Sequence, residues 1–181
     1  MSPEPAAPGR PRTTRRVRIE HLEPAVLRAL ALADLTAARA GTGTPLSPWL
    51  VDPVCVPIWR MRAEQVATDP GSARWVTGVV LDADELVPVG RAGFHGPPDG
   101  RGMVEVGYAI DPARRRQGYG TAVLAALVER ARAEPGVVVV RASVAPGNTA
   151  SLALVTRAGF VHVGDQVDEE DGPELVHELV L

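Results

Sequence analysis

The sequence MVEVGYAIDPARRRQGYGTAVLAALVERARAE, which spans residues 103–134, decides the fold of this chain. In residues 103–110, valine, tyrosine and isoleucine alternate with glutamate, glycine and alanine, and this period of two predicts a strand. Asp111 and Pro112 end the pattern, because proline has no N–H to donate to a neighbouring strand. From residue 121 onwards apolar side chains recur at spacings of three and four, which predicts an amphipathic helix.

An arginine- and glycine-rich loop, residues 114–120, joins this strand to this helix. A helix N-terminus attracts anions, because it carries unpaired N–H groups and the positive end of the helix dipole. Gly118 and Gly120 have no Cβ atom and leave room for a phosphate beside the backbone. The loop lacks the Gly-Lys-Ser/Thr end of a Walker loop and the GxGxxG pattern of dinucleotide-binding folds. The sequence therefore predicts a phosphate cradle of another kind.

Residues 115–120, RRQGYG, resemble the Arg/Gln-x-x-Gly-x-Gly/Ala signature of the GNAT superfamily of acetyl-coenzyme A-dependent N-acetyltransferases. The preceding YAIDP, residues 108–112, resembles the family's lead-in to that signature. A later segment, from NTASL at 148–152 to AGF at 158–160, resembles a second family motif. The resemblance is close over about residues 103–164, and it is greatest to the branch of ribosomal-protein-alanine/serine N-acetyltransferases.

The resemblance implies the GNAT acyl-CoA N-acyltransferase fold, an α/β fold in which helices flank a central mixed β-sheet. The sequence pattern agrees, because it predicts a crossover helix between the strand at 103–110 and a strand at 137–144. The other elements that we expect are a strand at 17–21, a helix from 23 to a stop at 41–43, a helix at 57–67, strands at 74–81 and 85–95, a helix at 148–157, and strands at 160–166 and 175–181.

The chain is predicted to hold one folded domain. Residues 1–16 are rich in proline and arginine and offer almost nothing to bury, so we expect a disordered tail. A basic arm that binds RNA is the alternative for this segment. Residues 17–181 are predicted to form a single GNAT N-acetyltransferase domain.

The composition narrows the class of protein. A hydrophobic fraction of 45% and a net charge of −3 fit an ordinary soluble domain with no overall attraction to nucleic acid or membranes. The single cysteine, Cys55, excludes an internal disulfide framework, and no apolar run approaches the roughly 20 residues that span a bilayer. We therefore expect a cytoplasmic protein without nucleic-acid or membrane partners, and we leave a homodimer open.

By the resemblance, acetyl-CoA is the expected cosubstrate, and its pyrophosphate would lie against the N–H groups of the loop. The main chain of residues 108–110 would pair with the pantetheine amides and donate an N–H to the developing oxyanion. One of the loop arginines would reach the 3′-phosphate. The predicted acetyl-CoA-binding residues are Tyr108, Ala109, Ile110, Arg115, Arg116, Gln117, Gly118, Tyr119, Gly120, Thr121 and Asn148.

The general acid and base follow less directly from the sequence. Many family members carry a tyrosine seven residues after the asparagine, and here that position is Val155. The nearby hydroxyl is Ser151, which resembles the serine of the ribosomal-protein branch, and hydrogen bonding at the helix start is its alternative role. The predicted base is Glu105, on the opposite strand face from Tyr108, with pairing to an arginine as the alternative. His95 is a further candidate.

Other reactive residue types do not form a recognisable site. Cys55 has no neighbouring histidine that would make it a nucleophile, so a small buried thiol is the favoured interpretation. Trp49 and Trp59 either line an acceptor pocket or belong to the hydrophobic core. We favour the second alternative. No metal site is predicted, because the histidines are scattered without ligand spacing, at His21, His95, His162 and His177.

These features predict an N-acetyltransferase that moves acetyl directly from acetyl-CoA to a primary amine in a ternary complex. The amine would belong to a protein N-terminus or to a small molecule. The alternative is a catalytically degenerate acyl-CoA-binding regulatory module, because the tyrosine is missing and the strand at 137–144 has no carboxylate. Both would bind CoA, and only the enzyme would release free thiol when given an amine.

Overall fold

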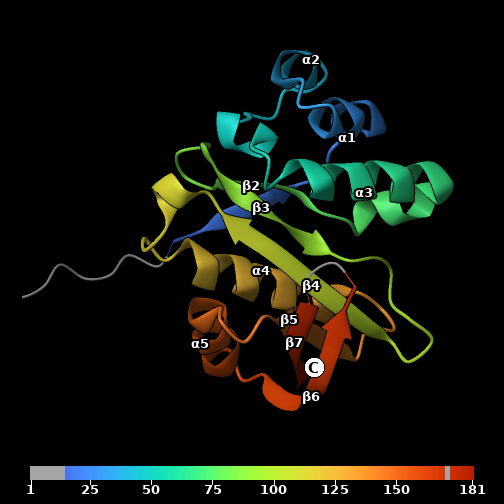
Figure 1. Ribbon diagram of the computed structural model, residues 1–181, viewed down its shortest axis with the longest axis vertical. Coiled ribbons are helices and arrows are strands. Elements are labelled where there is room, and N and C mark those ends of the chain that lie inside the picture. The colour runs from blue at the N-terminus through green and yellow to red at the C-terminus, as the bar shows by residue number, and fades with distance from the viewer. Residues whose placement is uncertain (1–14, 170–171) are drawn as a thin grey trace, which may run out of the picture.

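A computed structural model describes residues 15–169 and 172–181, which form a seven-stranded mixed sheet with helices on both faces (Figure 1). The strand order is β1-β2-β3-β4-β5-β7-β6. This arrangement confirms the predicted α/β architecture. The strands are β1 (Val17–Glu20), β2 (Gly78–Asp82), β3 (Pro88–Phe94), β4 (Met103–Ile110), β5 (Val139–Val144), β6 (Val161–Asp168) and β7 (Gly172–Val180). The helices are α1 (Pro24–Ala31), α2 (Leu35–Ala40), α3 (Val56–Thr68), α4 (Tyr119–Ala133) and α5 (Thr149–Arg157).

The sheet opens between its two central strands. β4 pairs with β3 in antiparallel fashion up to Ile110. Its other edge pairs with β5 in parallel over three residue pairs only, from Met103 beside Val139 to Glu105 beside Arg141. Beyond Glu105, no described strand continues the ladder on this edge of β4. The main-chain groups of that edge have no described strand partner there, and the carbonyl oxygen of Ile110 accepts a hydrogen bond from Nε of Arg115 at 3.1 Å.

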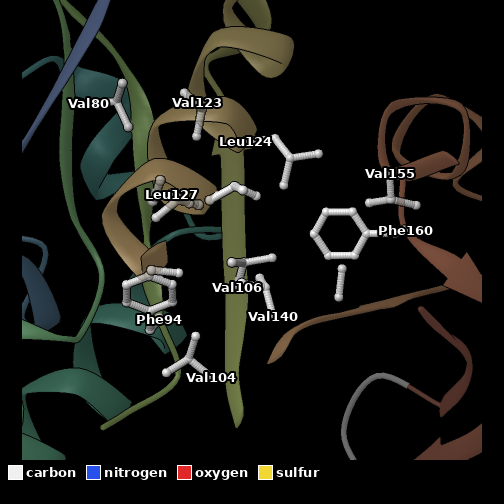
Figure 2. Packing of buried hydrophobic residues seen from close by; sticks show 14 of the residues in the cluster. Val80, Phe94, Val104, Val106, Val123, Leu124, Leu127, Val140, Val155 and Phe160 are labelled. Carbon is white, nitrogen blue, oxygen red and sulfur yellow. The ribbon is translucent and has the colours of Figure 1, made fainter. Parts of the chain in front are cut away.

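Each face of the sheet carries its own hydrophobic core. On one face α1 and α3 pack over the N-terminal strands, and this core includes Trp59 and Val79. On the other face α4 places Leu127 against Val106 of β4, as Figure 2 shows. Val79 and Val80 belong to different cores, because successive strand residues point to opposite faces. On β4, the strand on which the site is built, Val104 and Val106 are buried against this second core.

The region predicted as one helix, from 23 to a stop at 41–43, contains two helices, α1 and α2. The chain turns at Ala33, whose φ is 57°. Asp34 then caps α2, because its Oδ1 accepts a hydrogen bond from the N–H of Ala37 at 2.8 Å. The prediction of a single helix was wrong, since the apolar spacing continues across this new cap.

The strand predicted at 74–81 is also shorter than expected. Residues Pro70–Arg74 form a 3-10 helix, which Asp69 caps by accepting a main-chain N–H at 3.0 Å. β2 starts only at Gly78, where a Cβ atom would lie 2.2 Å from the carbonyl oxygen of Glu20. Glycine at this position lets β2 close against β1.

Residues 1–14 of the predicted tail lie outside the described residues. Its last two residues, Arg15 and Arg16, contact the turn between β2 and β3. The N–H of Ala83 donates to the carbonyl oxygen of Arg16 at 2.9 Å, and Nη1 of Arg15 lies 3.3 Å from Oδ2 of Asp82. In the part of the chain that the structure describes, no helix is both long enough and apolar enough to cross a membrane.

Candidate active site

A cavity of about 590 Å³ lies between the end of β4, the loop that follows it and the first turns of α4 and α5. Every predicted acetyl-CoA-binding residue except Gln117 lies on its wall. The exposed Gln117 uses its Nε2 to donate to the carbonyl oxygen of Ala113 at 3.3 Å. Six lining residues were not among those predicted to bind acetyl-CoA, namely Arg114, Ala150, Ser151, Ala153, Leu154 and Arg157.

The loop curls so that its N–H groups face one side. Arg116 and Gly118 have positive φ values of 62° and 91°, and Gly118 is the N-cap of α4. The N–H groups of the first helical turn have no partner within the helix, whose ladder begins with the N–H of Ala122 donating to Gly118 at 3.2 Å. Three arginines precede them in the sequence. This arrangement fits a phosphate group.

Gly120 lines the cavity and also packs against α5. A Cβ atom at this position would lie 2.9 Å from Cδ1 of Leu154, so glycine allows α5 to pack against the start of α4. At Gly118, in contrast, a Cβ atom would meet nothing closer than Cγ of Arg15 at 3.7 Å, and glycine is required there by the positive φ. The two glycines that the sequence treats alike therefore serve different purposes.

Tyr119 lines the cavity wall, but its ring is buried in the protein interior. Its hydroxyl donates to Oδ2 of Asp82 at 2.7 Å. Asp82 is 1% exposed and also accepts the N–H groups of Asp84 and Glu85 at 2.9 Å. The guanidinium of Arg15 completes the group, 4.9 Å from the centre of the Tyr119 ring. This cluster anchors the first turn of α4 to the β2–β3 turn.

Titration of the cluster reflects these contacts. The N–H of Glu85 is the largest cause that holds the pKa of Asp82 below its ordinary value, and the Tyr119 hydroxyl adds to the effect. Burial, together with the neighbouring carboxylate of Asp82, raises the pKa of Tyr119 to about 12. Near neutral pH the cluster therefore consists of an ionised Asp82 and a protonated Tyr119.

Glu105 lies on the face of β4 opposite to Tyr108, as predicted from the strand period. Its Oε1 accepts a hydrogen bond from Oγ of Ser143 at 2.5 Å, and its Oε2 lies 3.9 Å from Nδ1 of His95. The predicted alternative, a simple pair with an arginine, does not occur in the described residues. The nearby Arg141 pairs with Glu178 at 2.6 Å instead.

The residues of the second motif lie at the start of α5. Oδ1 of Asn148 accepts the N–H of Ser151 at 3.1 Å, so Asn148 is the helix cap. The hydroxyl of Ser151 faces the phenol of Tyr108, and both residues line the cavity. Val155 is fully buried beside Phe160, as Figure 2 shows. The position where many family members have tyrosine is therefore part of the apolar core.

The other candidates from the sequence lie in the core. Trp59 is fully buried, and its Nε1 donates to the carbonyl oxygen of Leu50 at 2.7 Å. Trp49 packs against the same core. Cys55 is buried, and burial raises the pKa of its thiol. Within residues 15–169 and 172–181, no group of three or more histidine, cysteine, aspartate or glutamate side chains could hold a metal ion.

Sequence reasoning missed Asp82 and Ser143 as functional partners. Asp82 carries no local signal beyond a turn, and it meets Tyr119 only after a separation of 37 residues. Ser143 was not singled out in the strand predicted at 137–144. Its proximity to Glu105 follows from the parallel pairing of β4 with β5, in which Glu105 lies beside Arg141.

Comparisons with known proteins identify the family of this chain. The family model of the acetyltransferase (GNAT) domain matches residues 13–161. An uncharacterised N-acetyltransferase of Bacillus subtilis strain 168, YjdG, is 28% identical over 98 residues. That match covers 54% of this chain and 58% of the relative, so the chain spans less than two thirds of that protein.

Solved structures share the fold at low identity. A spermidine N-acetyltransferase SpeG chimera from Vibrio cholerae and hSSAT has a TM-score of 0.65 at 14% identity, over 91% of this chain and 95% of that one. A ribosomal-protein-serine acetyltransferase-like protein from Vibrio cholerae has a TM-score of 0.62 at 18% identity, over 93% and 96%. With a family match over most of its length, the chain belongs to the GNAT acetyltransferase family.

Proposed function

We propose that this protein transfers an acetyl group from acetyl-CoA directly to a primary amine in a ternary complex. The observation that supports this most strongly is the gap between β4 and β5. There, the open edge of β4 leads to a cavity that ends at the N-terminus of α4. An elongated ligand with amides in the middle and phosphates at one end fits these groups.

The residues of the cavity suggest how the cosubstrate is held. The N–H groups at the start of α4 and the side chains of Arg114, Arg115 and Arg116 would bind the pyrophosphate and the 3′-phosphate. The edge of β4 at residues 108–110 would pair with the pantetheine amides, in place of the ladder that β5 does not continue. Asn148, at the start of α5, would contact the pantetheine end.

Glu105 would prepare the amine for attack. Its carboxylate would take the proton of the incoming ammonium group, and Ser143 holds that carboxylate in place through the 2.5 Å hydrogen bond. The N–H groups on the open edge of β4 would stabilise negative charge on the carbonyl oxygen as the N–C bond forms. The C–S bond then breaks and leaves coenzyme A as the second product.

For the amine acceptor we propose a chemical class, and for the oligomeric state we propose self-association without a fixed number of subunits. Structural neighbours are named for spermidine and for ribosomal-protein serine, so a polyamine and a protein N-terminus are both tested below. One neighbouring SpeG is dodecameric, and self-association of this chain, as a homodimer or larger, is tested by sedimentation. We place the protein in the cytoplasm, where a free thiol such as Cys55 stays reduced.

The alternative is a regulatory module that binds acyl-CoA without turnover, and the buried Val155 favours it. One experiment separates the two functions. Acetyl-CoA is titrated into the protein by calorimetry, and free thiol is then measured with spermidine, with a peptide that begins with alanine and with one that begins with serine. Binding with thiol release supports the enzyme, and binding without release by any amine supports the module. No binding contradicts both.

Glu105→Gln tests the proposed base. The variant should bind acetyl-CoA like the wild type and lose at least about 100-fold in kcat, as expected for removal of a general base. Glu178→Gln is the matched control, because Glu178 lies on the same sheet face but pairs with Arg141 and lies on β7, beyond β5 from β4. Equal kcat losses in the two variants would contradict the role of Glu105.

A further inference from the structure

Tyr108 has a buried hydroxyl without a hydrogen-bond partner. Within the described residues, no group meets its oxygen at hydrogen-bond geometry. The hydroxyl of Ser151 faces it, but at a separation or angle that falls short of a hydrogen bond. Native proteins pair nearly all buried polar groups, so an unpaired phenol requires an explanation. A ligand atom in the adjacent cavity would supply one.

The position of Tyr108 relates this hydroxyl to the proposed reaction. Tyr108 and Ser151 line the cavity from two elements, β4 and α5. Ser151 is held in place, because its N–H donates to Asn148. Glu105 lies three residues before Tyr108 on the opposite face of β4. A hydrogen-bond donor and a candidate base therefore lie on opposite faces of β4, the base at the last residue paired with β5 and the donor just beyond it.

The other groups that could meet a leaving sulfur are committed elsewhere. The chain has two tyrosines, and the hydroxyl of Tyr119 donates to Asp82 at 2.7 Å. Val155, at the position of the usual family tyrosine, is apolar and fully buried. Tyr108 is thus the one phenol of the sequence whose hydroxyl is uncommitted in the described structure.

We propose that Tyr108, together with the adjacent Ser151, donates a hydrogen bond to the sulfur atom that leaves when the acetyl group is transferred. This inference rests on the proposed function. As the N–C bond forms and the C–S bond breaks, the electron pair of the C–S bond moves to sulfur. Glu105, having passed the ammonium proton on to water, takes the second proton of the attacking nitrogen. Tyr108 keeps its own proton and stabilises the thiolate, which then takes a proton from water.

The ionisation of Tyr108 agrees with a donor that keeps its proton. Burial raises the pKa of Tyr108 above its ordinary value. A free thiol titrates near about 8.5 and tyrosine near about 10, so full proton transfer from this phenol to the thiolate is unfavourable, whereas a hydrogen bond is not. The phenol therefore remains protonated throughout the pH range in which the thiolate forms.

The first test needs no acceptor. CoA and desulfo-CoA, which lacks the sulfur atom, are titrated into the wild type and Tyr108→Phe at pH 7 and pH 9. In the wild type, the ratio of the affinity for CoA to the affinity for desulfo-CoA should rise roughly five-fold from pH 7 to pH 9. The reason is that the hydroxyl of Tyr108 stabilises the thiolate form of bound CoA. In Tyr108→Phe this rise should disappear. The rise should persist in Tyr119→Phe, the other tyrosine variant.

The second test measures turnover with whichever amine of the panel is acetylated fastest. Tyr108→Phe should lower kcat about 10- to 100-fold with an unchanged KM for acetyl-CoA, as expected for a lost hydrogen bond to a charged group. Ser151→Ala should lower kcat less. Tyr108→Phe should also melt no lower than the wild type, since it removes an unpaired polar atom.

The outcomes separate this inference from the proposed function. If the wild type binds neither CoA nor desulfo-CoA, the proposed function fails. If it binds both, and Tyr108→Phe keeps the wild-type kcat and the pH-dependent preference for CoA, then Tyr108 has no role at the sulfur atom. Should Tyr108→Phe melt lower than the wild type, Ser151→Ala repeats the ligand titration with a smaller change to the core.

Discussion

The two faces of the open edge of β4 are built in different ways. The phosphate side consists of main-chain groups in one continuous stretch, from the end of β4 to the first turn of α4. The proposed catalytic side consists of side chains from separate strands, namely Glu105 on β4 and Ser143 on β5, with His95 directly after β3. A backbone site needs only its local conformation, whereas a side-chain site needs the correct strand register. The first is therefore robust to substitution, and the second is easily changed.

Asp82→Ala has the largest expected effect. It tests whether the phosphate side depends only on neighbouring residues or also on the distant contact between Tyr119 and Asp82. The change leaves the Tyr119 hydroxyl and two main-chain N–H groups without their acceptor. We expect a loss of about 3–5 kcal/mol in the free energy of unfolding, typical for a broken buried charge network. Urea unfolding measures this loss, and calorimetry measures weaker acetyl-CoA binding.

Asp84→Ala is the matched control, because Asp84 is exposed and pairs with Arg16 at the surface. Its loss should stay below about 1 kcal/mol. If both variants retained wild-type stability and affinity, the anchor between the β2–β3 turn and α4 would be unimportant, and the phosphate side would indeed be local.

An alkaline titration also tests the contact between Tyr119 and Asp82, and its expected effect on stability is smaller. The pKa of Tyr119 is raised to about 12 in the folded protein, against about 10 in the unfolded chain. Between these values the folded state holds a proton that the unfolded state releases. The contribution of Tyr119 to stability is therefore complete below about pH 10 and is lost as the pH rises towards 12, by roughly 2–3 kcal/mol.

Urea unfolding between pH 9 and pH 11.5 measures this decline. The sequence contains no lysine, and the other groups that bear on this range, Cys55, Tyr108 and Arg62 with a pKa lowered to about 10, are unchanged in Tyr119→Phe. The difference between that variant and the wild type therefore isolates Tyr119. The stability of Tyr119→Phe should decline less steeply with pH than that of the wild type. Tyr108→Phe should retain the loss of stability that the ionisation of Tyr119 causes. Parallel declines in the wild type and Tyr119→Phe would contradict the assignment.

Ser143→Ala tests the catalytic side and has the smallest expected effect. The variant removes the hydroxyl that holds the carboxylate of Glu105 at 2.5 Å. We expect kcat to fall about ten-fold, equivalent to about 1.4 kcal/mol, because the base loses its fixed orientation. The KM for acetyl-CoA should not change, since Ser143 is not among the residues that line the cavity. A rise in that KM with constant kcat would place Ser143 on the phosphate side instead.

The sequence was sufficient for the parts that depend on short-range order. The period of β4, the position of the loop and the start of α5 next to Asn148 were all predicted, because each follows from neighbouring residues. Packing of Leu154 against Gly120 was not predicted, since it joins two helices that no local pattern relates. The contact between Asp82 and Tyr119 was missed for the same reason. The break at Ala33 was missed because apolar spacing alone does not reveal a new helix cap.

The short parallel ladder between β4 and β5 has a mechanical consequence. It joins the N-terminal part of the sheet to the β5–β7–β6 part through three residue pairs, whereas β5 and β7 share six. This seam is the shortest ladder in the described sheet, so opening along it separates the fewest strand pairs. A ligand that bridges the seam would join the two parts, and at one hundred times its dissociation constant it would add about 2.7 kcal/mol to the stability of the whole protein. Amide hydrogen exchange along the open edge of β4 would then slow in proportion to ligand occupancy.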